Sequence, residues 1–417
     1  MRNPSLRNIL LIWFGWAVVL LAFQNLVQMR VSLVRPDNVL SWTSTETGKS
    51  SNANRAFLVD PFLNAQVAWD SEYYLAIAVD GYDSPKVHGI PGEFQIGQSY
   101  KRMCQSNAFN CYSLSYAFFP VYPVLTRLVA LPIHLFNLTD IAAATLAGVI
   151  VSLLGALGAM FSIYFISRKS LGEEGGVRAA FYLLIFPSGF FLAQVYSEGV
   201  FIGITFAALA FLTARKWIWA ALFGALAVWA RPGGAILVLP FLIVWLMDKT
   251  WKEGAKSALL KLLTVLSPVI SYLIWFLSPL AKRFFIVENQ FFGRGLFALD
   301  ATKQVWSHAW QTLLHGNPSA KFYYGLEFAA ILLAFITCFL LLRKRPELAL
   351  FGLAMVFFAF TTGSAQGMVR YVVVAPPLFY MLSQWGKHQV FDRIWTIASV
   401  LLMGLEAMLF TFNFWVA

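Results

Sequence analysis

Long apolar runs alternate with short polar connections along most of the chain. Each run approaches the length of helix that crosses a bilayer, which predicts a membrane span. The predicted spans are 9–27, 141–166, 179–195, 199–214, 217–230, 233–247, 262–280, 324–342, 348–362, 371–385 and 394–412. The pattern predicts an all-α polytopic membrane protein with about 11 transmembrane helices in a single domain, residues 1–417.

Basic residues gather in alternate connections of this pattern. Cytoplasmic loops of membrane proteins carry an excess of Lys and Arg, so these connections are assigned to the inner side. They contain Arg2, Arg7, Arg168, Lys169, Arg178, Arg215, Lys216, Lys249, Lys252, Lys256, Lys261, Arg343, Lys344, Arg345, Lys387 and Arg393. Two long segments, 28–136 and 281–323, then fall on the outer side, the first as the expected catalytic loop.

The apolar piece 116–136 at the end of the first outer loop does not fit a full span. Pro120, Pro123 and Pro132 interrupt it, and proline breaks helical hydrogen bonding. A full span here would also reverse the side of every later connection. We expect a re-entrant or surface-lying amphipathic helix instead.

The amino-acid composition agrees with an integral membrane protein. Hydrophobic residues make up 59% of the chain, and the mean hydropathy is +0.67. The net charge of +11 follows from the basic inner connections. Composition therefore argues against a soluble domain and against nucleic acid as a partner.

Acidic residues are concentrated in the stretch 69–83 of the first outer loop, beside Trp and Tyr residues that favour the membrane–water boundary. A carboxylate at that depth can act as a base on a substrate delivered from the bilayer. Asp70 is the candidate. Glu72 lies two positions further on and would point elsewhere on a helix, although a cation site shared with Asp70 stays open.

Arg231 and Arg370 break the charge pattern, since each stands alone in a short outer connection. An Arg at mid-bilayer costs about 3 kcal/mol, so such a residue usually has an anionic partner. A guanidinium fork suits a phosphate. The alternatives are snorkelling to the headgroups or an internal pair with Glu198 or Glu327.

The junction that carries Arg231 lies between two short predicted spans, 217–230 and 233–247. Helices of this length do not cross a bilayer upright, so we expect the junction in a recess below the outer surface. Glu198 opens another predicted span directly after Ser197. It is either an acid at a helix N-terminus, with Ser197 as cap, or an acceptor for a sugar hydroxyl.

Cys104 and Cys111 lie in the same outer loop as Asp70. In an oxidising compartment they can form a disulfide, and this is the pairing we expect. Two free thiols are the alternative. A metal pair is disfavoured because no His or further Cys lies close by.

Four stretches together resemble the GPI mannosyltransferase II family (PIG-V-like) and its bacterial relatives, in the C-type (GT-C) glycosyltransferase superfamily. They are Trp69-Asp70 with Tyr74 to Ala78 and Gly81-Tyr82; 117–123, which contains Tyr122; 186–191 with Tyr196-Ser197-Glu198 and Arg231-Pro232; and 367–371 with Pro376 and the closing 415–417. They span nearly the whole chain. Glu72 and a longer polar insertion, 86–111, depart from the family pattern.

The resemblance implies a GT-C-type helix bundle and an inverting transfer of a hexose, with mannose as the expected sugar, from a polyprenyl-phosphate donor to a lipid or glycan acceptor. It implies Asp70 near the reacting centre. Substrate contacts are expected from Arg370, Arg231, Trp69, Tyr74, Glu198, Tyr371 and Tyr122. The expected location is a bacterial inner membrane with the site facing outward, or the ER membrane in a eukaryote.

Three other functions stay open: a lipid-linked-sugar transporter or flippase, a non-catalytic accessory subunit, and a ligase that uses a diphosphate-linked glycan. No cofactor follows from the sequence, because neither a Gly-rich phosphate loop nor an Asp-x-Asp triplet is present. A divalent cation stays open.

Overall fold

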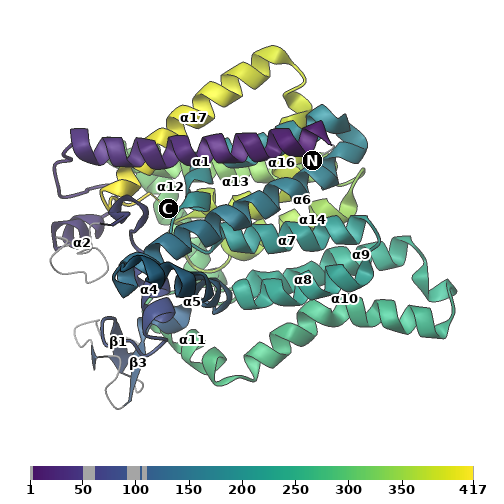
Figure 1. The fold of residues 1–417 in the computed structure, drawn as a ribbon, viewed down its shortest axis with the longest axis horizontal. Coiled ribbons are helices and arrows are strands. Elements are labelled where there is room, and N and C mark those ends of the chain that lie inside the picture. The colour runs from purple at the N-terminus through teal and green to yellow at the C-terminus, as the bar shows by residue number, and fades with distance from the viewer. Residues whose placement is uncertain (1–2, 50–61, 92–103, 106–109, 417) are drawn as a thin grey trace.

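The computed structural model describes residues 3–49, 62–91, 104–105 and 110–416. Most helices run along the long axis of the molecule, as Figure 1 shows. The first half of the chain contains α1 (Pro4–Arg30), α2 (Thr43–Lys49), η2 (Asn64–Gln66), α4 (Ser71–Val79), η3 (Leu114–Ala117), α5 (Val121–Ile133), η4 (His134–Phe136), α6 (Asp140–Ile185), η5 (Pro187–Ala193) and α7 (Glu198–Thr213).

The second half is also helical. It contains α8 (Trp217–Ala230), η6 (Pro232–Leu237), α9 (Val238–Met247), η7 (Thr250–Lys252), α10 (Ala255–Phe276), α11 (Pro279–Gln290), α12 (Leu299–His315), α13 (Pro318–Leu341), α14 (Pro346–Phe360), α15 (Met368–Tyr371), η8 (Val372–Val374), α16 (Pro376–Trp385) and α17 (Gln389–Thr411). The predicted all-α class is confirmed.

Five helices of the described chain are long and apolar enough to cross a membrane: α1, α6, α10, α13 and α17. A sixth candidate is the pair η5 and α7, which is bent by 99°. The protein is therefore a multi-pass membrane protein, as predicted.

The predicted total of about 11 spans differs from this number for two reasons. The run 141–166 and the first part of the run 179–195 lie in one helix, α6, whose backbone leaves helical geometry at Gly172 (φ 77, ψ 176). The rest of the second run lies mostly in η5. The runs 217–230, 233–247, 348–362 and 371–385 overlap the short helices α8, α9, α14 and α16, which have only 14, 10, 15 and 10 residues. Each predicted run does overlap a helix.

The predicted first outer loop folds at one end of the bundle. Figure 1 shows α2, α4, the small sheet and α11 together at the left, away from the N-terminus. The 13-residue helix α5 follows Pro120, has Pro132 inside it, and packs against α4 and α6. Most of the insertion 86–111 and the final residue of the 415–417 motif lie outside the described residues.

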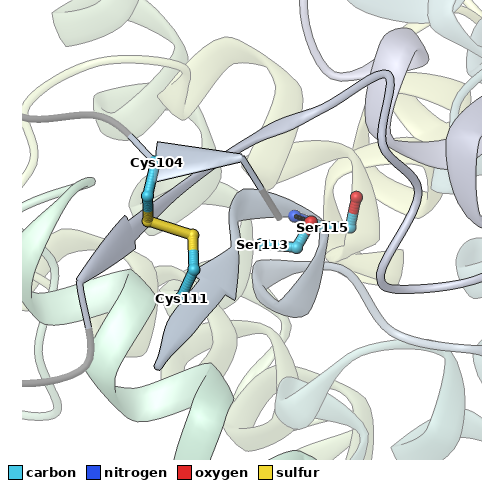
Figure 2. The surroundings of a disulfide bond; sticks show 4 residues. All are labelled: Cys104, Cys111, Ser113 and Ser115. Atoms are coloured by element: carbon cyan, nitrogen blue, oxygen red, sulfur yellow. Dashed lines mark hydrogen bonds between the residues drawn. A yellow bond between two sulfur atoms is a disulfide. The ribbon is translucent and has the colours of Figure 1, made fainter. Parts of the chain in front are cut away.

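The small sheet has the strand order β2-β1-β3, with β1 (His88–Pro91), β2 (Cys104–Gln105) and β3 (Cys111–Ser113). A disulfide joins Cys104 to Cys111 across the central strand, as Figure 2 shows. A side chain on Gly89 would put its Cβ 2.6 Å from the Cys111 sulfur. A glycine at this position therefore leaves room for the bridge.

Close contact between α6 and α7 fixes where α7 begins. A Cβ on Gly155 would lie 2.4 Å from the Gly199 carbonyl carbon, so only glycine permits this approach. The Ser152 hydroxyl of α6 donates to the Gln194 carbonyl at 2.6 Å or to the Tyr196 carbonyl at 2.9 Å. These contacts hold the turn that precedes Glu198.

Buried amide side chains connect the first loop to the bundle. The Gln24 side chain on α1 accepts hydrogen bonds from Gln66 at 3.2 Å and Gln194 at 3.1 Å, and donates to the Ala65 carbonyl at 3.1 Å. All three glutamines are fully buried. This network fixes η2, from which the chain enters the Asp70 turn.

Candidate active site

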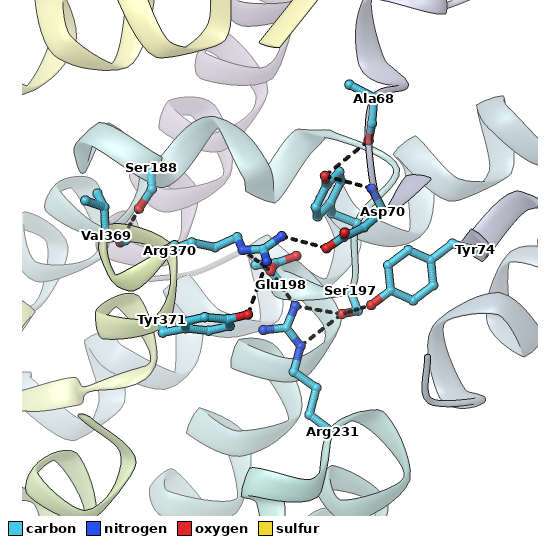
Figure 3. Close-up of polar contacts among 12 residues, drawn as sticks. Ala68, Asp70, Tyr74, Ser188, Ser197, Glu198, Arg231, Val369, Arg370 and Tyr371 are labelled. Carbon is cyan, nitrogen blue, oxygen red and sulfur yellow. Dashed lines mark hydrogen bonds and ion pairs between the residues drawn. The ribbon is translucent and has the colours of Figure 1, made fainter. Parts of the chain in front are cut away.

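A strained turn presents the Asp70 carboxylate. Trp69, directly before it, has a left-handed backbone (φ 52), which is uncommon for a residue other than glycine. The Tyr196 hydroxyl accepts the Asp70 N–H at 3.2 Å and donates to the Ala68 carbonyl at 3.1 Å. The Asp70 side chain does not cap α4, and Figure 3 shows it pointing toward Arg370.

Arg370 reaches Asp70 from the other end of the chain. One guanidinium nitrogen donates to Asp70 Oδ2 at 2.9 Å, and Nε lies 3.4 Å from Glu198 Oε1. The guanidinium carbon lies 5.4 Å from the ring centres of both Phe191 and Tyr196, within the range of cation–π attraction. The Arg370 side chain is only 6% exposed, whereas Asp70 is 29% exposed. The cation is thus held in place while the carboxylate stays accessible.

Glu198 lies between two cations. Its Oε1 pairs with Arg231 as well as Arg370, and its side chain is 3% exposed. A carboxylate so deeply buried needs such partners. Its second oxygen, Oε2, is buried and finds no hydrogen-bond partner within the described part of the chain. Glu198 can therefore accept one further hydrogen bond.

The expectation that Ser197 caps α7 through its side chain is wrong. Ser197 occupies the N-cap position without a side-chain cap bond. Its hydroxyl oxygen instead accepts from Arg231 Nε at 3.0 Å and Nη2 at 2.9 Å, and forms a 2.7 Å hydrogen bond with the Tyr74 hydroxyl. Burial raises the pKa of Tyr74 well above its ordinary value, so it stays a neutral phenol. Ser197 thus links α4 to the Arg231 junction.

The predicted second outer loop also contributes side chains. Arg294, after α11, donates to the Tyr371 hydroxyl at 3.2 Å, and Arg370 donates to the same oxygen at 3.3 Å. Burial raises the pKa of Glu288 on α11 to about 7, against the opposing effect of Arg294, while the nearby Asp70 charge adds to the rise. Sequence reasoning missed Arg294 and Glu288 as site residues, since neither belongs to a motif.

Two predicted residues, Trp69 and Tyr122, make their contacts outside this cluster of charges. Trp69 packs against Trp42 and Trp415, with ring centres 6.0 and 5.1 Å apart, and donates from its indole to the Phe414 carbonyl at 3.1 Å. Tyr122 is fully buried and donates to the Gly148 carbonyl at 3.0 Å. Glu72 lies in the first turn of α4.

The side chains of the site bear on whether it can hold a metal ion. The described residues contain no group of three or more His, Cys, Asp or Glu side chains arranged to hold a metal. Asp70 is the carboxylate that could share a cation with Glu72. One of its oxygens accepts a hydrogen bond from Arg370.

No family model matches the chain, and no curated protein matches its sequence. Among solved structures, it is similar to ArnT from Cupriavidus metallidurans bound to undecaprenyl phosphate, with 14% identity and a TM-score of 0.47 over 86% of this chain and 75% of that one. ArnT from the same organism in the apo state has 15% identity and a TM-score of 0.43, over 96% of this chain and 76% of that one.

The chain is also similar to the archaeal oligosaccharyltransferase AglB from Archaeoglobus fulgidus in complex with an inhibitory peptide and a dolichol-phosphate. The identity is 14% and the TM-score 0.38, over 96% of this chain. The match spans 56% of the length of AglB.

Proposed function

We propose that the protein is a membrane-embedded, inverting glycosyltransferase of the GT-C type. It moves a hexose, with mannose as the first candidate, from a polyprenyl-phosphate donor to a lipid or glycan acceptor on the outer face. The observation that carries the proposal is the accessible Asp70 carboxylate held 2.9 Å from the buried Arg370 guanidinium. A carboxylate that can act as a base thus lies beside a guanidinium that can bind a phosphate, in a multi-pass membrane protein.

The charge of the site supports an anionic donor. Three guanidinium groups, those of Arg231, Arg294 and Arg370, surround two carboxylates, Asp70 and Glu198. The surplus positive charge suits a phosphodiester, which carries one negative charge at neutral pH. Guanidinium groups match phosphate oxygens in pairs of hydrogen bonds.

The Glu288 carboxyl does not cancel this surplus in mildly acidic solution. Burial raises its pKa to about 7, so below that pH it is mostly protonated and uncharged. The balance of charge therefore still favours a bound anion.

The proposed reaction is a single displacement. The acceptor hydroxyl oxygen attacks the anomeric carbon and forms the new C–O bond, while the bond from that carbon to the phosphate oxygen breaks. The electron pair leaves with the lipid phosphate, whose charge Arg370 and Arg231 stabilise. The hydroxyl proton passes to Asp70 as general base. Attack opposite the leaving group inverts the anomeric configuration.

In the proposed reaction, binding of the donor also breaks the ion pair between Asp70 and Arg370. A bound phosphate replaces the Asp70 carboxylate as the partner of Arg370, so donor binding releases the base for the acceptor. Glu198 Oε2 is buried and has no hydrogen-bond partner among the described residues, so it could accept a sugar hydroxyl that enters the site. Because a phosphate monoester is a workable leaving group, the proposal requires no metal.

The proposal is tested with purified protein, radiolabelled polyprenyl-phosphate mannose and a membrane lipid extract, with and without a chelator. We expect a labelled glycolipid that forms in the presence of the chelator and does not form with Asp70→Asn. Transfer only from a diphosphate-linked glycan would replace the proposal by a ligase. No transfer from either donor, with lipid movement across vesicles instead, would favour a transporter.

A further inference from the structure

The cation at the centre of the site, Arg370, belongs to a segment that has little helical structure of its own. Helix α15 has only 4 residues, Met368–Tyr371, and its N-cap, Gly367, has a left-handed backbone (φ 79). One isolated turn is not stable by itself, because nucleating a helix costs more than its first hydrogen bonds return. The position of Arg370 must therefore be fixed by contacts from other elements.

A buried carboxylate of α13 supplies the main contact. Glu327 is fully buried, and its two oxygens accept the N–H of Gly367 at 2.7 Å and the N–H of Val369 at 2.9 Å. The first amides of a helix lack internal partners, and a negative charge near them is favourable. Glu327 thus satisfies the amide donors at the start of α15.

The opposite side of the segment is held from η5. The Ser188 hydroxyl donates to the Val369 carbonyl at 2.7 Å, as Figure 3 shows. Val369 is therefore fixed at its N–H by Glu327 and at its C=O by Ser188. Both contacts reach the residue directly before Arg370.

A carboxylate fits this arrangement in a way that its amide does not. Two N–H donors approach two oxygens that only accept. A glutamine would offer one oxygen and one NH₂ group, so one amide of the segment would face a second donor. An ionisable residue inside a membrane span is costly, which points to a functional reason for Glu327.

We propose that Glu327 is a positioning residue that sets the Arg370 guanidinium against Asp70 and Glu198. The sequence left Glu327 open as an ion-pair partner of Arg370. In the described structure Arg370 instead pairs with Asp70 and Glu198. Glu327 does not contact the guanidinium and acts on Arg370 through the backbone of the preceding residues. This inference rests on the proposed function, since it concerns binding of the donor phosphate by Arg370.

The test measures binding of undecaprenyl phosphate to the full chain in detergent micelles. We expect Glu327→Gln to weaken binding at least ten-fold. Glu347→Gln is the matched control, because Glu347 is also a buried carboxylate, paired with Arg345 at 2.7 Å at the far end of α14. We expect it to change affinity less than two-fold.

A double-mutant cycle separates positioning from a general loss of structure. If Glu327 acts through Arg370, then Glu327→Gln has no further effect on affinity when Arg370 is already alanine. Equal losses in both backgrounds, or equal losses for Glu327→Gln and Glu347→Gln, overturn the inference.

Two further comparisons keep the test decisive. Should Glu327→Gln fail to fold, Ser188→Ala takes its place, with a smaller loss of affinity expected in the native background and none in the Arg370→Ala background. If Arg370→Ala itself binds the lipid phosphate normally, the proposed function fails. If Arg370→Ala weakens binding and Glu327→Gln does not, only the positioning role fails.

Discussion

Asp70 and Arg370 are separated by 300 positions in the sequence and form an ion pair of 2.9 Å in the folded chain. Asp70 enters from the first outer loop and Arg370 from the segment before α16. Arg370 is buried, whereas Asp70 is partly exposed. Under the proposed function, a lipid phosphate would compete with Asp70 for the guanidinium, and donor binding would then release the proposed base.

Replacing Asp70 by Asn should abolish transfer and tighten donor binding. The amide cannot take up the acceptor proton, and it no longer competes for Arg370 with a full charge. Only the Asp70 side of the pair is partly exposed to solvent. We expect a gain of about 1 kcal/mol, which corresponds to about five-fold in affinity. Transfer assays and donor binding measured on the same protein check both parts. Normal turnover would refute the role of Asp70 as base.

Arg370→Lys separates positive charge from guanidinium geometry. Lysine keeps the charge but lacks the planar fork that contacts Asp70 and Glu198 and that would bind a phosphate in place of Asp70. We expect donor binding to weaken by about 2 kcal/mol, roughly thirty-fold, because a charge-assisted hydrogen bond is lost. Arg370→Ala should weaken it further. Donor KM and kcat measured for both variants provide the test, and unchanged values would exclude the phosphate clamp.

Glu198→Gln should lower the free energy of unfolding of the protein, and bound lipid phosphate should restore part of it. Arg231 and Arg370 share the Glu198 carboxylate, so its loss leaves a buried cation, Arg370, and a partly buried one, Arg231, without their common partner, at a cost of about 3 kcal/mol. A bound phosphate restores negative charge between them, and a ligand that binds only the folded state stabilises it. Undecaprenyl phosphate should therefore raise the melting temperature of Glu198→Gln more than that of the native protein. Equal shifts would contradict this account.

The sequence predicted the parts of the site that depend on local pattern. Membrane-length apolar runs predicted the helices, isolated charges beside apolar runs predicted Glu198, Arg231 and Arg370, and an acidic stretch beside Trp and Tyr predicted Asp70. These four meet in the structure because charged side chains in such surroundings need partners. Their assignment to catalysis and phosphate binding stays a prediction.

Other features depended on contacts that a sequence pattern does not encode. Arg294 and Glu288 reach the site only because α11 folds back onto the first loop, and no motif marks them. Ser197 has the residue type and position of a helix cap, but its hydroxyl bonds instead to Arg231 and Tyr74. The break in α6 at Gly172 could not be distinguished from a connection between two spans, because either interpretation fits the same apolar runs.

The disulfide offers a test of which side of the membrane the site faces. Cys104 and Cys111 are bridged, whereas Cys338 is free and buried. If the first loop lies in an oxidising compartment, protein isolated under thiol-blocking conditions should contain the Cys104–Cys111 bridge. Mass spectrometry of non-reduced peptides checks this. After reduction of intact cells, a membrane-impermeant maleimide should label both cysteines, and protection of both would place the loop on the inner side.

Glu288 should make donor binding depend on pH near neutrality. Burial raises its pKa from the ordinary 4.5 to about 7. Its proton therefore stabilises the folded state fully below about pH 4.5, and this contribution is lost as the pH rises through about 7. Above that pH an ionised Glu288 adds negative charge beside Arg294 and Asp70. A phosphodiester donor keeps a single charge over this range, so the titration of the protein alone should weaken binding.

We expect donor affinity to fall by about five-fold between about pH 6 and pH 8, equivalent to about 1 kcal/mol. Glu288→Gln should bind with the same affinity at both pH values, because the neutral side chain cannot ionise. Glu347→Gln, which removes a carboxylate remote from the site, should keep the native pH dependence. Identical pH profiles for the native protein and Glu288→Gln would show that another group controls the titration, and would remove Glu288 from the electrostatic balance of the site.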